Sequence, residues 1–584
     1  DWQIDADEIE LNLEKNRGYA DNATIKFYGV PIFYTPKHSW VLSGRGSGFL
    51  TPNYSTYNEP DSRYNEPEQD DDAYSLRVPY YLNLAPDRDL LVALTYMSSR
   101  GWIYEGKYRQ LIAPSTEYGN SKYSIEAKYL QEDKLTNLKR WLFNFSEDLN
   151  LSKKTRLSAR FNRVSDSKYF EEIARTNTNT EKLKSFIKIS YQDKEENIEA
   201  SALTETEQIV NDGSPGYTRA LEGSVSKTFN AKTKLPIGVS LVSTRFAHKT
   251  ASKESGIRTH SNIGISRKLN VQYPTITPRA SIAITNYSLK NNPNINRTIL
   301  GSGLDINFTI NRQSSIFGFK ANNRISPIIT YNYRAKKVQG NIPLFDSTDK
   351  YDDIISFADL TSGERYTGLD RITNANDFTL SLESAYKKSG AKTSDKDFLN
   401  MKIAQSYFTD DEVVSDEINT NYETRKSYSD IAASIDISVN KFTLSSAAQF
   451  NPDTSRIVKR TNTISYKPSS RKFITLGFNK TGIDEVVEET ENLYGAYPLT
   501  DSIHLFGGLN KNISAGITNS ETTGVAYESC CWAVRLAHFK DHKSSGGYNY
   551  STGMELVLTG LGSTSSPLKN RIENKIPGYK ANLR

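Results

Sequence analysis

The sequence has few cysteines, methionines, tryptophans and histidines. Its 584 residues include two Cys, three Met, five Trp and six His. The two cysteines, Cys530 and Cys531, are adjacent. Neighbouring Cα atoms lie about 3.8 Å apart, whereas a disulfide requires a Cα separation of roughly 4.4–6.8 Å. A disulfide between these two residues is therefore unfavourable, and the chain holds no third cysteine with which either could pair.

Long apolar runs and a strong net charge are also missing. No run approaches the ~18 apolar residues of a transmembrane helix, and the opening residues, DWQIDADEIE, lack the basic and apolar regions of a signal peptide. The 73 Lys and Arg residues exceed the 68 Asp and Glu residues by only 5. This small, dispersed excess argues against a nucleic-acid-binding surface and against an acidic tail.

What the chain does have is aromatic residues and strict alternation. Aromatic residues make up 11% of the chain, while the apolar fraction is 37%, which is low for a large soluble core. In DFTLSLESAY, Phe378, Leu380 and Leu382 share one face of a strand, and Thr379 and Ser381 share the other. The apolar faces run for about 9–11 residues and often end in aromatics, as the strands of a membrane β-barrel do.

The length indicates a very large barrel. About 21 residues per strand and connection give roughly 24–28 strands. We therefore predict an all-β fold: an antiparallel transmembrane β-barrel of about 26 strands over residues 44–562, followed by a C-terminal tail over 563–584. A soluble β-sandwich would also alternate, but its strands would be shorter.

The first 43 residues follow a different pattern, with short strands and expected turns at residues 16–18 and 20–22. The apolar positions that define these strands are Trp2, Ile4, Ile9, Leu11, Leu13, Ala23, Ile25 and Phe27. They resemble the end of a small β-jellyroll and are too few to bury a core of their own. We expect residues 1–43 to be the C-terminal remnant of a periplasmic jellyroll domain.

Signals for chemistry are weak. His538 and His542 have a spacing that suits zinc on a helix but not on a strand. The glycine-rich residues 44–48 lack the lysine and the following helix of a phosphate-binding loop. The acidic residues 59–72 could bind divalent cations, but a solvated loop is the simpler interpretation. We therefore expect no catalytic residue, cofactor or metal site.

Two prolines are more informative. Pro52 and Pro79 lie in the expected first two barrel strands, where a proline removes a ladder donor. Each could simply mark a strand end. Alternatively, two in succession beside the closing junction indicate pairing that is kept weak.

Several motifs resemble the LptD family, the lipopolysaccharide-assembly barrels of Gram-negative outer membranes. These motifs are GVPIFYTP, SGFLTP, PYYLNLAPDRD, MSSRG, KRWLFNFSEDL, RVSDSKYF, ERYTGLDRITNAND, YESCCWAVR and MELVLTGLGS. Between residues 171 and 362 only the alternation supports the resemblance.

The resemblance implies a transporter and not an enzyme. It implies a barrel plugged by an LptE-type lipoprotein, a jellyroll that receives lipopolysaccharide from an LptA-type periplasmic bridge, and a lateral gate between the first and last strands. Pro52 and Pro79 match the prolines of that gate. The gate would also include Phe49, Leu50, Met554, Leu556 and Leu558.

Cys530 and Cys531 match a cysteine pair that, in the family, forms disulfides to the periplasmic domain. Their partners would lie upstream of residue 1.

Three alternatives are considered. Another transport barrel, either porin-like or a siderophore-type receptor, is the nearest, but a receptor plug needs roughly 150 residues and only about 43 precede the first expected barrel strand. An outer-membrane hydrolase would need a Ser/His/carboxylate site that the spacing does not support. The third is a surface adhesin.

Overall fold

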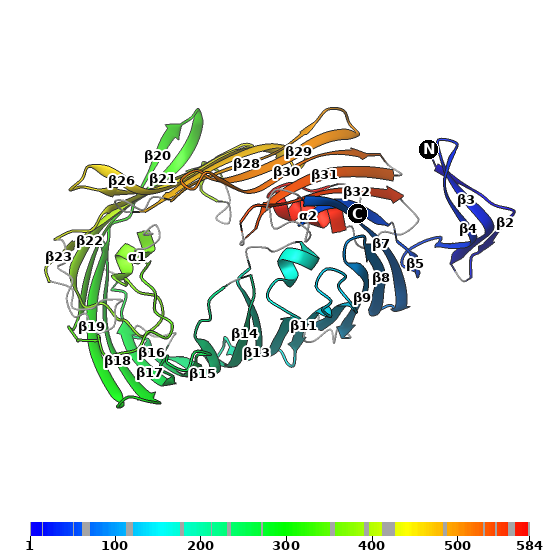
Figure 1. The fold of residues 1–584 in the computed structure, drawn as a ribbon. Coiled ribbons are helices and arrows are strands. Elements are labelled where there is room, and N and C mark those ends of the chain that lie inside the picture. Colours follow the sequence, from blue (N-terminus) through cyan, green and yellow to red (C-terminus); the bar gives the residue numbers. More distant parts are fainter. Residues whose placement is uncertain are drawn as a thin grey trace.

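The computed structural model of the chain is a large ring of strands with a small separate sheet beside it (Figure 1). It describes residues 2–14, 16–50, 52–60, 70–112, 121–175, 180–211, 213–230, 235–269, 273–350, 357–390, 396–410, 427–482, 488–529, 532–543, 546–558 and 567–581.

The small sheet contains the first four strands. They are β1 (Trp2–Asp5), β2 (Glu8–Asn12), β3 (Arg17–Phe27) and β4 (Val30–Val41). Strand β3 pairs with all three of the others. The turn expected at residues 20–22 is wrong, because β3 continues through it. Asn22 lies at a φ of 52° within that strand, a conformation that asparagine tolerates better than most residues.

The ring is a closed antiparallel barrel of 26 strands, as the alternation predicts. Its first half contains β6 (Asn53–Pro60), β7 (Asp70–Ala85), β8 (Arg88–Met97), β9 (Gly101–Ile112), β10 (Ser121–Leu130), β11 (Arg140–Asn150), β12 (Thr155–Val164), β13 (Lys182–Asp193), β14 (Ile198–Ile209), β15 (Thr218–Phe229), β16 (Ile237–Ala247), β17 (Gly256–Ser266), β18 (Thr275–Leu289) and β19 (Ile295–Asn307). Its second half contains β21 (Phe319–Arg334), β22 (Ala375–Lys388), β23 (Leu399–Phe408), β24 (Ile431–Val439), β25 (Phe442–Asn451), β26 (Arg456–Ser469), β27 (Lys472–Thr481), β28 (Glu488–Pro498), β29 (Ile503–Asn512), β30 (Ile517–Glu528), β31 (Trp532–His542) and β32 (Tyr548–Leu558).

Two further strands extend this ring. The two-residue β5 (Gly48–Phe49) pairs with β7 beside the start of β6. Strand β20 (Ile310–Ile316) forms a hairpin with the beginning of β21, and this hairpin projects beyond the wall (Figure 1).

The burial pattern of the wall is inverted relative to a soluble protein. On β22, Phe378 and Leu380 point outward and are 45% and 48% exposed, whereas Thr379 between them points inward and is fully buried. Apolar side chains on the outside and polar side chains on the inside are what a barrel in lipid requires. Closure of the ring also pairs the backbone of every wall strand, which hydrocarbon demands.

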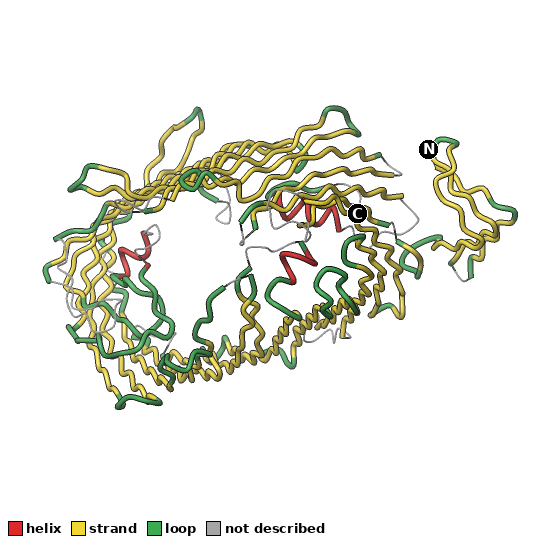
Figure 2. The backbone as a smooth tube through the Cα atoms, in the orientation of Figure 1, coloured by secondary structure: helices red, strands yellow, loops and turns green. Residues whose placement is uncertain are grey.

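Three short helices lie inside the ring of strands (Figure 2). They are the π-helical turn η1 (Phe170–Ala174), α1 (Phe357–Ser362) and α2 (Pro567–Lys575). Because successive strands are antiparallel, their connections alternate between two rims. We call the rim that adjoins the small N-terminal sheet the proximal rim, and the opposite rim, where loops 165–181 and 335–374 begin, the distal rim.

Candidate functional site

The barrel closes where its first and last long strands, β6 and β32, meet. We call this junction the seam. Its register runs from Ser551 opposite Tyr57 to Glu555 opposite Asn53, which is five residue pairs. The other neighbouring wall strands are joined by registers of six pairs, as for β12 with β13, to fourteen, as for β21 with β22. The seam is therefore the shortest ladder between neighbouring wall strands in the described part of the barrel.

The seam ends at Pro52. This residue is exposed and directly precedes Asn53, the first residue of β6. Asn53 forms the final pair of the register with β32. A proline has no N–H group with which to extend a ladder. Beyond that point, Leu556 and Leu558 of β32 are in register with β31, while the register with β6 has ended.

Pro79 lies on β7, the strand that pairs with β6 on the side away from β32. It is a buried residue of β7, opposite Ala93 of β8. Its carbonyl accepts a hydrogen bond of 2.9 Å from the backbone N–H of Leu50. Phe49 is opposite Tyr80 of the same strand, and the two rings meet edge-on at 4.9 Å. Both prolines thus lie at the proximal end of the seam, where β6 has given way to β5.

Of the residues expected to form the gate, Met554 lies within the paired part of the seam. It is opposite Tyr54, and its side chain is half exposed on the outer face. Residues on either side of it, Gly553 and Glu555, face the lumen and are buried.

A buried charge cluster lies behind the proximal half of the seam. The Arg535 guanidinium on β31 contacts Glu555 of β32 at 2.9 Å and Glu528 of β30 at 2.9 Å. Asn53 donates a hydrogen bond of 3.3 Å across the seam to Glu555. All three charged side chains are at most 2% exposed. This cluster joins the last three strands to one another more firmly than to β6.

Helix α2 covers the luminal face of β31 and β32. Leu568 and Ile572 are buried in a cluster with Phe506 and Phe539 of the wall. A Cβ atom on Gly553 would lie 2.8 Å from Leu568 Cδ1, so the helix approaches the last strand this closely because residue 553 has no side chain.

The first part of loop 165–181, residues 165–175, covers the other side of the seam from the inside. Tyr169, Phe170 and Ile173, in and beside η1, pack in a cluster with Tyr57 of β6 and Met97 of β8. The two luminal bodies therefore belong to opposite sides of the seam: loop 165–181 to the first strands and α2 to the last.

A cavity of about 580 Å³ separates these two bodies and opens onto the inner face of the seam. Its lining includes Asn53, Ser55, Ser551, Ile173, Leu568 and Asn570. It also includes a charged group on the wall, in which Glu105 contacts Arg77 at 3.1 Å and Lys128 at 3.4 Å. The cavity behind the seam is therefore lined by both kinds of side chain: polar and charged groups of the wall, and apolar groups such as Leu91, Met97 and Ile103.

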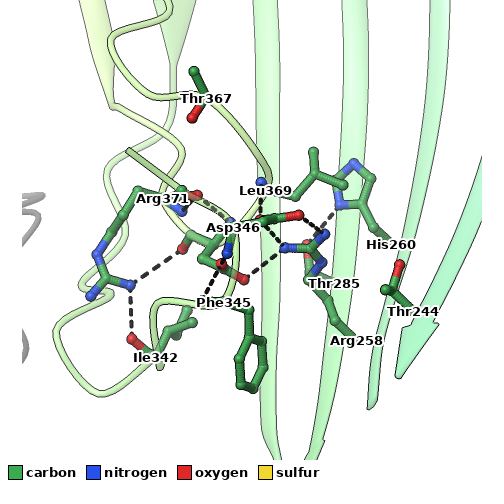
Figure 3. Close-up of polar contacts among 12 residues, drawn as sticks. Thr244, Arg258, His260, Thr285, Ile342, Phe345, Asp346, Thr367, Leu369 and Arg371 are labelled. Atoms are coloured by element: carbon green, nitrogen blue, oxygen red, sulfur yellow. Dashed lines mark hydrogen bonds and ion pairs between the residues drawn. The ribbon is translucent and has the colours of Figure 1, made fainter. Parts of the chain in front are cut away.

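A second luminal loop, residues 335–374, is attached to the wall at β17 (Figure 3). Arg258 of β17 donates to both carboxylate oxygens of Asp346, at 2.6 and 2.7 Å, and to Asp370 at 2.7 Å. Asp370 also accepts 2.7 Å hydrogen bonds from the backbone N–H groups of Phe345 and Asp346. One buried arginine of the wall thus holds two separate parts of the loop.

Further contacts fix the same loop. Arg297 of β19 donates to the carbonyls of Leu369 and Asp370, at 2.6 and 2.9 Å. The ring of Phe345 stacks on that of Phe246, with centroids 4.6 Å apart. Arg371 donates to the Ile342 carbonyl at 2.8 Å, which closes the loop on itself (Figure 3). The described parts of loop 335–374 are therefore an ordered part of the luminal structure.

The electrostatics of Asp346 match this arrangement. Burial by itself raises the pKa of its carboxyl group, but the hydrogen bonds and charge of Arg258 outweigh burial, so the pKa lies below its ordinary value. The contact therefore stabilises the folded loop above the ordinary carboxyl pKa of about 4, and this contribution is lost as the pH falls through the lowered value.

The N-terminal sheet packs against the proximal end of the seam. Ile25 of β3 and Trp532 of β31 are buried together, with Leu556 of β32 packed against them. Tyr28 meets the Trp532 ring edge-on at 6.3 Å. Cys530 and Cys531 themselves lie outside the described residues, but Trp532 follows them directly in the sequence.

The sequence did not reveal the luminal bodies. One signal for α2 was present, because Leu568, Ile572 and Ile576 recur every four residues, as on a helix face, and all three are buried. Residues 61–69 of the acidic segment 59–72 lie outside the described part of the chain, and its remaining residues belong to β6 and β7.

In the described part of the chain, no three His, Cys, Asp or Glu side chains are grouped so that they could hold a metal ion. None of the helices there has the length and apolar character needed to cross a membrane.

Comparison with known proteins identifies the family. The family model described as LPS transport system D, LptD, matches residues 138–510. LPS-assembly protein LptD of Shewanella oneidensis is 25% identical over 601 residues, covering 97% of this chain and 75% of that protein. The protein of the same name from Cupriavidus necator is 26% identical over 612 residues, covering 99% and 71%.

Solved structures add little to this result. The alcaligin outer-membrane receptor FauA of Bordetella pertussis is 9% identical and covers 92% of this chain and 80% of its own, but the TM-score is 0.30, too low to carry an argument. The family model, in contrast, covers more than half of the 584 residues, and the chain therefore belongs to the LptD family.

Proposed function

We propose that this protein inserts lipopolysaccharide into the outer leaflet of the outer membrane of a Gram-negative bacterium, and that the substrate leaves the barrel sideways through the seam. The observation that carries the proposal is the five-pair register between β6 and β32, which ends at Pro52. A ladder of this length costs less to separate than its neighbours in the same wall, since each lost pair forfeits backbone hydrogen bonds.

The two surfaces of the barrel suit the two parts of such a substrate. The outer face is apolar, as Phe378 and Leu380 illustrate, and fits acyl chains in the bilayer. The cavity behind the seam has a mixed lining, in which Asn53, Ser55, Ser551 and the charged group around Glu105 offer hydrogen bonds to a saccharide. When the seam parts, the saccharide can cross the wall while the acyl chains stay in lipid. The barrel itself supplies no energy in this mechanism.

The proposal includes two protein partners. An LptE-type lipoprotein would plug the barrel from inside, and an LptA-type bridge would deliver lipopolysaccharide through the jellyroll of which β1–β4 are the last part. Membership of the LptD family supports both. Purification of the complex from membranes tests the plug: a tightly bound lipoprotein is expected, and a barrel that is isolated alone would contradict it.

Cys530 and Cys531 would fix the periplasmic domain to the barrel by two disulfides. Support comes from their neighbour Trp532, which packs against Ile25 of the N-terminal sheet. Mass spectrometry of the full-length protein, with and without reduction, tests whether each cysteine is linked to the periplasmic domain.

A reversible cross-link tests the lateral exit. Tyr54 and Met554 are directly opposite each other across the seam, and Leu536 and Met554 are directly opposite across β31 and β32. We expect Tyr54→Cys with Met554→Cys to stop lipopolysaccharide export when oxidised and to restore it when reduced.

The matched control is Leu536→Cys with Met554→Cys, which should leave export unchanged in both states. Surface lipopolysaccharide is measured in cells that carry the full-length protein. Continued export through a fully cross-linked seam would show that the substrate does not leave there.

A further inference from the structure

The seam is held differently at its distal end. Beyond Ser551 opposite Tyr57, side chains take the place of the backbone ladder. The Asn58 side chain accepts a 2.6 Å hydrogen bond from the Tyr550 backbone N–H and donates one of 3.2 Å to the Tyr548 carbonyl. A single amide thus bonds two backbone groups of the opposite strand.

Arg175, at the end of η1, reaches both strands of the seam. Its Nη2 atom donates to the Asn58 carbonyl at 2.7 Å and to the Asn549 side-chain oxygen at 3.1 Å. Its guanidinium lies 4.6 Å from the centre of the Tyr57 ring, and its side chain is 9% exposed. Asn549 in turn donates to the Glu171 carbonyl at 3.4 Å. Loop 165–181 therefore bonds the last strand as well as the first.

The loop that carries Arg175 is firmly attached to the first side of the seam. Arg140 of β11 contacts Glu172 of η1 at 2.8 Å and Asp133 at 3.2 Å. Arg100 contacts Asp133 at 2.6 Å and Glu59 of β6 at 2.5 Å. These ion pairs, with Arg100, Arg140, Asp133 and Glu59 buried, lie beside the apolar cluster around Phe170. If β32 moves away, η1 stays with β6, and the contacts with Asn549 must break.

The seam is thus unequal at its two ends. At the proximal end Pro52 stops the ladder, and Leu556 lies beyond the register with β6. At the distal end, the Asn58 and Arg175 side chains join β6, η1 and β32. If β6 and β32 separate from the Pro52 end, the contacts of Arg175 are the last to break.

We propose that Arg175 is a latch that closes the distal end of the seam, and that it must release Asn549 before the seam can part along its whole length. This rests on the proposed function only for its purpose, namely control of lateral exit. The latch itself is a property of the free protein. Arg175 acts by positioning the two strands and needs no contact with the substrate.

Hydrogen exchange at the seam tests the latch. In Arg175→Met of the full-length protein with its membrane partner in lipid nanodiscs, we expect the amides of Tyr550 and Thr552, which face β6, to exchange about 10- to 100-fold faster, because charged hydrogen bonds across the seam are lost. The matched control is Arg163→Met. Arg163 lies just before the same loop and donates to Thr206 at 3.3 Å, away from the seam.

Unchanged exchange at the Tyr550 and Thr552 amides in Arg175→Met would overturn the proposal. So would an equal acceleration in the β9–β10 ladder, which would indicate general loosening. Asn549→Ala removes the partner on β32 alone and should give the same local acceleration. It replaces Arg175→Met in this test if that variant does not assemble. Arg175→Lys, which keeps the charge but not the planar fork, should exchange at an intermediate rate.

The latch and the proposed function fail separately. Exchange is measured without substrate, whereas the Tyr54–Met554 cross-link is scored by export. Faster exchange in Arg175→Met together with export through a locked seam would support the latch and refute lateral exit. Unchanged exchange in Arg175→Met together with loss of export in the oxidised Tyr54–Met554 cross-link would refute the latch and leave lateral exit in place.

Discussion

At the scale of single residues, the lumen is organised by buried arginines. Arg258 contacts Asp346 and Asp370, and Arg535 contacts Glu528 and Glu555. Each guanidinium has two carboxylates because an isolated buried charge would be far too costly. Such groups add little net stability when complete, but removing one partner is strongly destabilising. They therefore determine which arrangement of the luminal loops is allowed.

Arg258→Met should release loop 335–374 from the wall. The substitution leaves the Asp346 and Asp370 carboxylates without their shared arginine, at a cost of about 3–5 kcal/mol. We expect rapid proteolysis within the loop while circular dichroism still reports an intact β-barrel. The matched control is Arg324→Met. The Arg324 side chain is 49% exposed and lies 3.7 Å from Glu383, so its loss should change stability by less than about 0.5 kcal/mol. Equal protease resistance in both variants would contradict this role of Arg258.

At the scale of elements, α2 shows how a short segment is fixed by its surroundings. Nine residues are too few to form a stable helix alone in water. Leu568 and Ile572 bury its apolar face against the wall, and Arg571 and Lys575 both contact Asp541, at 3.3 and 2.5 Å. The helix is therefore attached to β31 and β32, whereas the charge network and apolar contacts of η1 attach it mainly to the first strands.

The two seam prolines belong to the same scale. Pro52→Ala restores a backbone N–H directly beyond the last pair of the β6–β32 register. Pro79→Ala restores one on the side of β7 whose carbonyl already accepts from Leu50, so the two changes together should strengthen strand pairing at the proximal end of the seam. A tighter seam should slow lipopolysaccharide export. Surface lipopolysaccharide per molecule of barrel is the measurement.

Pro327→Ala is the control for the proline variant. Pro327 lies on β21, opposite Leu382 of β22 and far along the wall from the seam, so this change should leave export as it was. Undiminished export in the double variant would mean that the prolines mark strand ends and nothing more.

At the scale of the whole molecule, the direction in which each residue faces decides its environment. Ile263 of β17 is 44% exposed on the outer face, and its neighbour Asn262 lines a luminal cavity. An arginine near the bilayer midplane costs about 2–4 kcal/mol. Ile263→Arg should therefore lower the yield of folded barrel in lipid vesicles, and Asn262→Arg should lower it much less. Equal yields would contradict the assignment of the lipid-facing side.

The alternation alone determined the type of fold and which residues share a face. Phe378, Leu380 and Leu382 were predicted to oppose Thr379 and Ser381, and they do. This works because a strand turns successive side chains to opposite faces whatever its neighbours are. The family motifs further suggested a gate that includes the two prolines, and this stays a prediction; in the structure Pro52 directly precedes the first residue of β6.

Only the tertiary structure decided how the inside of the barrel is arranged. Arg175 and Asn549 are 374 residues apart in the chain, and Arg258 and Asp370 are 112 apart. No local pattern relates such residues, because they meet only after closure brings the first strand beside the last and folds the distal loops inward. The sequence by itself determined a polar lumen within an apolar wall. Ring closure decided which polar groups in that lumen join the two strands of the seam.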